Sequence, residues 1–161
     1  MMKILITIII AFASISIKAQ CNTKTTLRPD GNTITYFNPK PIIRQAQYEV
    51  GTAIYKNETT GIYLVNISVL FKAMLSDNIT GNLTIQTTGK KAVELKLVKS
   101  EQVEMNGKTL SIGLYGIDKN SFEELKKYPL KSMFFYLDGK RVGATVTESK
   151  NVFMTQLNCI K

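Results

Sequence analysis

The chain has 161 residues, of which 44% are hydrophobic and 20% are charged. That length suits one ordinary domain rather than two, and the composition excludes an intrinsically disordered chain. Its 21 basic and 12 acidic residues give a formal charge of +9 at pH 7, and it contains no histidine. The lack of histidine excludes Ser-His-Asp and Cys-His catalysis and histidine-rich zinc sites.

The first residues have the pattern of a secretory signal peptide. The positive charge of Lys3 precedes a run at positions 4–17 that is apolar except for one threonine and two serines, and the small residue Ala19 offers a cleavage site. We therefore expect a signal peptide over 1–19 and one β-rich domain over 20–161, starting at Gln20. The alternative is an N-terminal membrane anchor that is never cut. No other segment approaches the roughly 18 apolar residues of a transmembrane helix, so we expect no span in the mature chain.

Loss of this leader would remove Lys3 and Lys18 and leave 19 basic residues against the 12 acidic ones. Such an excess favours anionic partners, for example an acidic glycan of the cell envelope. The basic residues nevertheless form no run longer than two, as is typical of solvated turns. Export also argues against a nucleic-acid partner.

After Cys21 the dominant pattern is apolar alternation interrupted by turn residues, which predicts antiparallel strands. Arg28-Pro29-Asp30-Gly31 predicts a turn into a strand over Thr33–Phe37, and the two prolines of Asn38–Pro41 predict an extended connector. Apolar residues at every second position from Tyr63 to Phe71 predict a long strand. The loop Asn57–Gly61 should join it to a strand over Tyr48–Lys56.

Two dipeptides in the second half predict tight hairpins, because both of their residues tolerate positive φ. A turn at Asn106-Gly107 places Val103 opposite Leu110, and one at Asp138-Gly139 places Phe135 opposite Val142. In the second hairpin the same register sets Met133 against Ala144, while Phe134, Tyr136 and Arg141 lie on the other face. Between Leu83-x-Ile85 and Val93-x-Leu95-x-Leu97, the pair Thr88-Gly89 predicts a further turn.

One helix is expected, near residues 121–127. Ser121 followed by Glu124 has the spacing of a capping box, Phe122 and Leu125 provide apolar contacts, and Pro129 ends the helix. A last strand is expected over Asn151–Cys159. These elements together predict a mainly β fold, an antiparallel β-sandwich or partly open barrel built from hairpins.

The two cysteines, Cys21 and Cys159, lie near the ends of the mature chain. A bacterial lipid anchor at Cys21 needs a small residue directly before it, and Gln20 stands there. A nucleophilic cysteine needs a base, usually histidine, to lower its pKa. A disulfide needs only an oxidising compartment and an even count, so we expect a Cys21–Cys159 bond, with lipidation or two free thiols as the alternatives.

No catalytic, metal-binding or cofactor motif is present. Glu123-Glu124 falls in the predicted first turn of the helix, and Asp30, Asp77 and Asp138 stand beside Gly or Asn in turn-forming company. A calcium site at Asp30–Asn32 or Asp77-Asn78 would not match a helix-flanked calcium loop. An enzyme that uses carboxylates alone, such as a glycosidase, remains an alternative.

Binding surfaces are harder to identify from the sequence. The four strand tyrosines could stack on sugar rings, although ordinary sheet packing explains them equally well. These are Tyr36, Tyr55, Tyr63 and Tyr136. An exposed sheet edge could also recruit an extended peptide without leaving a sequence pattern.

The isoleucine-rich leader ending in KAQC, the segment TTLRPDGNTITYFNP and the C-terminal QLNCIK resemble small exported β-rich proteins of Bacteroidetes bacteria, particularly flavobacteria. This resemblance implies a bacterial host but brings no activity, cofactor or site residue. We therefore expect a non-enzymatic exported β-domain that serves as a binding or structural module in the periplasm, at the cell surface or outside the cell. Its partner would be a protein or an anionic glycan of the envelope. The alternative is an accessory subunit of an envelope assembly, tethered by lipid at Cys21.

Overall fold

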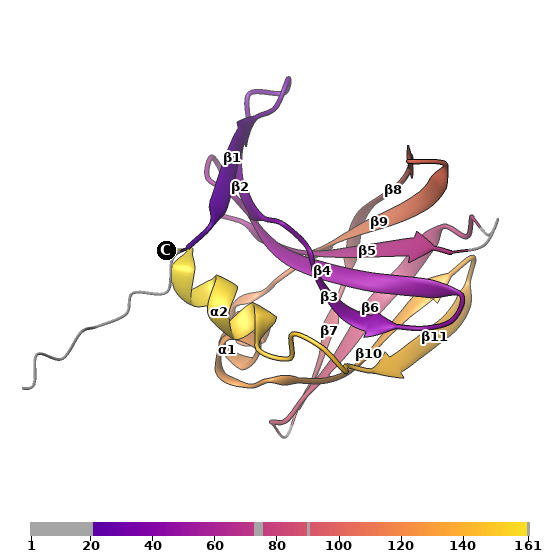
Figure 1. Ribbon diagram of the computed structural model, residues 1–161. Coiled ribbons are helices and arrows are strands. Elements are labelled where there is room, and N and C mark those ends of the chain that lie inside the picture. The colour runs from indigo at the N-terminus through magenta and orange to yellow at the C-terminus, as the bar shows by residue number, and fades with distance from the viewer. Residues whose placement is uncertain (1–20, 73–75, 90, 161) are drawn as a thin grey trace, which may run out of the picture.

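The protein folds into two antiparallel sheets and two helices, as seen in a computed structural model that describes residues 21–72, 76–89 and 91–160 (Figure 1). The larger sheet has the strand order β1-β2-β4-β5-β9-β8, with β3 also paired to β4. Its strands are β1 (Thr23–Leu27), β2 (Thr33–Phe37), β3 (Lys40–Arg44), β4 (Tyr48–Asn57), β5 (Tyr63–Phe71), β8 (Leu97–Met105) and β9 (Lys108–Gly116).

The smaller sheet has the order β11-β10-β6-β7. Its strands are β6 (Ile79–Thr87), β7 (Ala92–Leu95), β10 (Leu130–Leu137) and β11 (Lys140–Thr145). The chain changes sheet three times: between β5 and β6, at Lys96 between β7 and β8, and between β9 and β10. One cluster of buried apolar residues draws on both sheets and both helices, and the strands do not close into a barrel. The β-sandwich expected from the sequence is therefore confirmed.

The predicted hairpins have the predicted registers. Val103 pairs with Leu110 across Asn106-Gly107, and Phe135 pairs with Val142 across Asp138-Gly139. Asn106 and Asp138 have φ values of 54° and 45°, the left-handed region that these turns require. The predicted pairing of Tyr48–Lys56 with the Tyr63–Phe71 strand is also present.

Strand β4 shares one of its edges between two partners. β3 pairs with it over Glu49–Thr52 and β2 over Tyr55–Asn57, while β5 runs along the whole of its other edge. The expected extended connector at Asn38–Pro41 is a connector only over its first two residues, because Lys40 and Pro41 begin β3 and Pro41 pairs with Gly51. A proline is tolerated here because β3 is an edge strand, which can lack a donor on its outer side.

The first helix, α1 (Lys119–Lys127), begins earlier than the sequence suggested. Its N-cap is Asp118, whose carboxylate accepts from the Ser121 N–H and from the Ser121 hydroxyl, each at 2.9 Å. The predicted cap at Ser121 is therefore wrong, because the charged Asp118 carboxylate binds both Ser121 donors. Glu123 and Glu124 consequently lie beyond the first turn, which contains no acidic residue.

The expected strand over Asn151–Cys159 is wrong, because Val152–Cys159 forms a second helix, α2. Its buried residues are Val152, Phe153, Gln156 and Leu157, and their i, i+1, i+4, i+5 spacing follows helical periodicity. The spacing of Phe153 and Leu157 suits either a strand or a helix. The tertiary contacts of α2 with α1 and β4 decide in favour of the helix.

Candidate functional site

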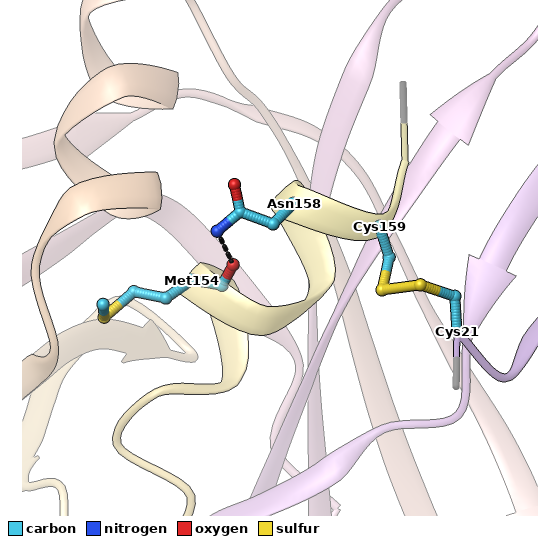
Figure 2. The surroundings of a disulfide bond; sticks show 4 residues. All are labelled: Cys21, Met154, Asn158 and Cys159. Atoms are coloured by element: carbon cyan, nitrogen blue, oxygen red, sulfur yellow. Dashed lines mark hydrogen bonds between the residues drawn. A yellow bond between two sulfur atoms is a disulfide. The ribbon is translucent and has the colours of Figure 1, made fainter. Parts of the chain in front are cut away.

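A disulfide joins Cys21, two residues before β1, to Cys159, the last residue of α2 (Figure 2). The two Cα atoms are 5.7 Å apart although 138 positions separate them in the sequence. The predicted bond is thus present. It ties the first described residue to the C-terminal helix, and Figure 1 shows that helix ending beside the start of β1. The predicted cleavage residues Ala19 and Gln20 lie outside the described residues.

Helix α2 is also held by a hydrogen bond to β4. The Gln156 side-chain oxygen accepts from the backbone N–H of Ile54 at 2.7 Å, and both residues are buried. Ile54 lies between the β4 segments that pair with β3 and with β2, so its N–H has no strand partner on that edge. A buried unpaired N–H is costly, and Gln156 removes that cost. The position of α2 is therefore fixed at its middle, by Gln156, and at its last residue, by Cys159.

A cleft of about 530 Å³ opens beside the disulfide. Its walls come from three segments that are far apart in the sequence: the two residues before β1, the segment around the β2–β3 connection, and α2 with the loop that precedes it. The lining residues are Cys21, Asn22, Phe37, Asn38, Lys40, Ser149, Lys150, Asn151, Val152, Thr155, Gln156 and Cys159. The cleft exists because the disulfide and Gln156 hold α2 against the edge of β4.

The cleft is cationic and rich in hydrogen-bonding groups. Lys40 and Lys150 are the charged residues among those that line it, and no described lining residue is acidic. Four amide side chains and two hydroxyls supply further donors and acceptors. Phe37 and Val152 add buried apolar surface. Ammonium groups that attract an anion, beside amides and one aromatic ring, suit a ligand that carries both negative charge and hydroxyl groups.

The beginning of α2 lies at the same cleft, where the Val152 N–H already donates to the backbone oxygen of Ser149 at 2.9 Å. A helix leaves its first N–H groups without intrahelical acceptors, and a side chain at the N-cap usually satisfies one of them. Here the N-cap residue Asn151 makes no side-chain capping bond. Asn151 and Val152 both line the cleft, so the positive end of the α2 dipole adds to the charge of Lys150.

A second groove, between β7 and α1, is acidic on balance. Glu94, Asp118, Glu123 and Glu124 line it together with two lysines. Three of these acids have structural tasks: Asp118 caps α1, Glu124 accepts from the Thr87 hydroxyl at 2.7 Å, and Glu94 accepts from the Asn82 amide at 2.8 Å. The two Ser121 hydrogen bonds hold the pKa of Asp118 below its ordinary value.

The acidic residues that the sequence placed in turns also form hydrogen bonds that stabilise the local fold. Asp30 accepts from the Asn32 N–H at 3.0 Å, which lowers the Asp30 pKa, and Asp138 accepts from the Asn78 N–H at 3.0 Å. The backbone oxygen of Asp77 accepts from the Ser111 hydroxyl. Among the residues that the structure describes, no three potential ligands gather into a metal-binding group.

The four tyrosines considered as sugar platforms do not meet at one place. Tyr36 and Tyr55 contact each other with ring centroids 5.4 Å apart, whereas Tyr63 packs on Phe122 at 4.9 Å. Tyr136 lies against Gly81 in the smaller sheet. Their positions favour ordinary sheet packing.

Sequence reasoning missed the residues that define the cleft. Lys40 and Lys150 are more than a hundred positions apart, and each looked like an isolated surface charge. Gln156 fell in a segment that was expected to be a strand. The single available signal was the predicted disulfide, because it required the two ends of the chain to meet.

Within the described part of the chain, no helix has the length and apolar character of a membrane span. Comparison of the chain with protein-family models, with curated proteins and with solved structures gives no match.

Proposed function

We propose that this chain is an exported, non-enzymatic β-domain that binds an acidic glycan of the cell envelope in the cleft beside the disulfide. The observation that carries the proposal is the lining of that cleft. Lys40 and Lys150 provide charge without an opposing carboxylate among the described lining residues. The surrounding amide side chains can exchange hydrogen bonds with sugar hydroxyls.

The disulfide supports the proposal that the chain is exported. Structural disulfides form and persist in oxidising surroundings such as the periplasm or the cell exterior, and this one buttresses the proposed site directly. The signal-peptide pattern of residues 1–19 agrees with export. A clasped β-sandwich would present the cleft as a rigid, preformed surface, which lowers the ordering cost of binding.

A titration calorimetry experiment tests the function. The probe is an oligogalacturonate, with its methyl-esterified, neutral form as the matched ligand. We expect the acidic probe to bind and the neutral one to bind at least tenfold more weakly, with affinity falling as salt is added. Equal affinity for both probes, or no binding of either, would contradict the proposal.

Variants locate the site. Lys40→Gln and Lys150→Gln should each weaken binding of the oligogalacturonate by about tenfold, the size of one charge-assisted hydrogen bond. Lys24→Gln and Lys108→Gln make the same charge change on β1 and β9, outside the cleft, and should leave the affinity within about twofold. If all four variants lose affinity equally, binding is diffuse and the cleft is not the site.

The alternative of a lipid-tethered accessory subunit is less well supported. The thioether of a lipoprotein needs the sulfur of Cys21, and that sulfur is bonded to Cys159. A diacylglyceryl adduct at Cys21 in protein purified from a native envelope would favour the alternative. A carboxylate-only enzyme is also less well supported, because three of the four acids in the groove beside α1 already hold the fold.

A further inference from the structure

Strand β8 forms one edge of the larger sheet. It pairs with β9 on one side, and no strand in the described part of the chain pairs with its other side. Figure 1 shows the β8–β9 hairpin at the opposite end of the sheet from β1 and the C-terminal helix. An edge strand presents a row of unpaired N–H and C=O groups, which can pair with another chain.

The side chains of β8 are unusually open to solvent for a nine-residue strand. Every residue from Val98 to Met105 is exposed, and Leu97 alone is partly covered. In the described part of the chain five large apolar side chains are exposed, and three of them belong to this strand: Val98, Val103 and Met105. Apolar side chains gathered along one free edge are typical of an interaction surface.

The charges on β8 favour one register for pairing with a second copy of the strand. Lys99 and Glu101 lie two residues apart on the same face of the sheet and form an ion pair. In two identical antiparallel strands related by a two-fold axis, opposite residues lie on the same face, so the axis must pass through a residue position. An axis at Lys99 or Glu101 would place like charges directly opposite each other. An axis at Ser100 places Lys99 opposite Glu101 of the second copy, twice.

We propose that β8 pairs antiparallel with β8 of a second copy of this chain, centred on Ser100, so that the two larger sheets become one continuous sheet across the dimer. The four charges then alternate in sign along the line where the two strands pair. The pairing satisfies the outward backbone groups of β8. It leaves the cleft beside the disulfide open in both copies, because β8 and the strands around the cleft lie at opposite ends of the sheet.

A charge-swap series tests this register by sedimentation equilibrium of the disulfide-intact protein, without ligand. Lys99→Glu and Glu101→Lys alone each place like charges opposite one another at two positions and should raise the dimer dissociation constant about tenfold. The double variant restores both pairs and should return the constant to within about twofold of the starting protein. Lys108→Glu changes the charge equally outside the paired segment and should have little effect.

A cysteine pair tests the centre of the seam independently. Opposite residues of antiparallel strands have Cα atoms about 4.5–5.5 Å apart, so Ser100→Cys should form a disulfide with its counterpart under mild oxidation. Glu104→Cys lies on the same strand and the same face but four residues from the axis, so it should not cross-link. A protein that stays monomeric at all concentrations, or equal cross-linking of both variants, would overturn the proposal. Rescue of dimerisation by the double charge swap cannot come from a diffuse contact and would support it.

Discussion

The side chain of Gln156 on α2 accepts a hydrogen bond from the backbone N–H of Ile54 on β4, with 2.7 Å between the two atoms and 102 positions between the residues. The bond occupies the gap where β3 stops pairing with β4 and β2 begins. It therefore completes the sheet edge and fixes the helix that forms one wall of the cleft.

Replacing Gln156 by Met keeps the side-chain volume but removes the acceptor. We expect a loss of about 1–3 kcal/mol in the free energy of unfolding, because the buried Ile54 N–H is left without a partner. Urea unfolding followed by far-UV circular dichroism measures it. Asn158→Ala on the same helix removes an exposed amide that donates to the Met154 backbone oxygen, so it should cost less than about 0.5 kcal/mol. Equal losses in the two variants would show that the Ile54 bond has no special weight.

Removing the disulfide should destabilise the fold strongly. The bond closes a loop that spans a sequence separation of 138, for which chain entropy predicts a contribution of about 4–5 kcal/mol. The double variant Cys21→Ser, Cys159→Ser should therefore show a much lower urea midpoint than the oxidised protein, and the reduced wild-type protein should match it. A midpoint unchanged by either treatment would mean that α2 is held without the bond.

The hydroxyl of Tyr115 is buried between the sheets and has no hydrogen-bond partner among the described residues. Burial raises the pKa of Tyr115 well above its ordinary value. Tyr115→Phe should raise the free energy of unfolding by about 1 kcal/mol, because an unsatisfied polar group is removed without loss of ring packing. Tyr48→Phe, at a half-buried ring, is the matched control and should change little. A destabilised Tyr115→Phe protein would indicate that the hydroxyl has a partner, such as a buried water.

Asp118, rather than Ser121, should be the residue whose side chain supports the start of α1. Asp118→Ala should cost about 1 kcal/mol at neutral pH, as loss of an N-cap usually does. The pKa of Asp118 is lowered in the folded protein, so its charge contributes stability above the ordinary aspartate pKa of 3.8 and loses it as the pH falls through the folded value.

The difference between wild type and Asp118→Ala should therefore shrink on acidification below pH 3.8, and urea unfolding at several pH values measures it. Asp118→Asn keeps an acceptor without the charge and should flatten this pH dependence. A larger loss in Ser121→Ala than in Asp118→Ala would restore the cap that the sequence predicted.

Local chemistry determined the parts of the fold that could be predicted. Asn106-Gly107 and Asp138-Gly139 fix their own hairpins, because a two-residue turn with positive φ sets the register of every pair beyond it. The disulfide was predicted from an expected oxidising compartment and from the even number of cysteines. These inferences need only neighbouring residues or a simple covalent rule.

The remaining features depend on contacts between distant segments. Asn151–Cys159 has a strand-like composition, yet packing on β4 and α1 makes most of it a helix. No local sequence pattern predicts that Gln156 accepts a hydrogen bond from Ile54, or that Lys40 and Lys150 line the same cleft. The change of sheet at Lys96 could not be predicted from the sequence either, because one alternating apolar pattern runs from Val93 to Leu97 although β7 and β8 belong to different sheets.

The most direct test of the proposed function is a ¹⁵N-resolved NMR titration of the disulfide-intact protein with oligogalacturonate. We predict that backbone and side-chain amide shifts concentrate at Asn38, Lys40, Asn151 and Gln156, while the β8–β9 hairpin stays unchanged. Shifts confined to other surfaces, or a spectrum that does not change at all, would contradict it.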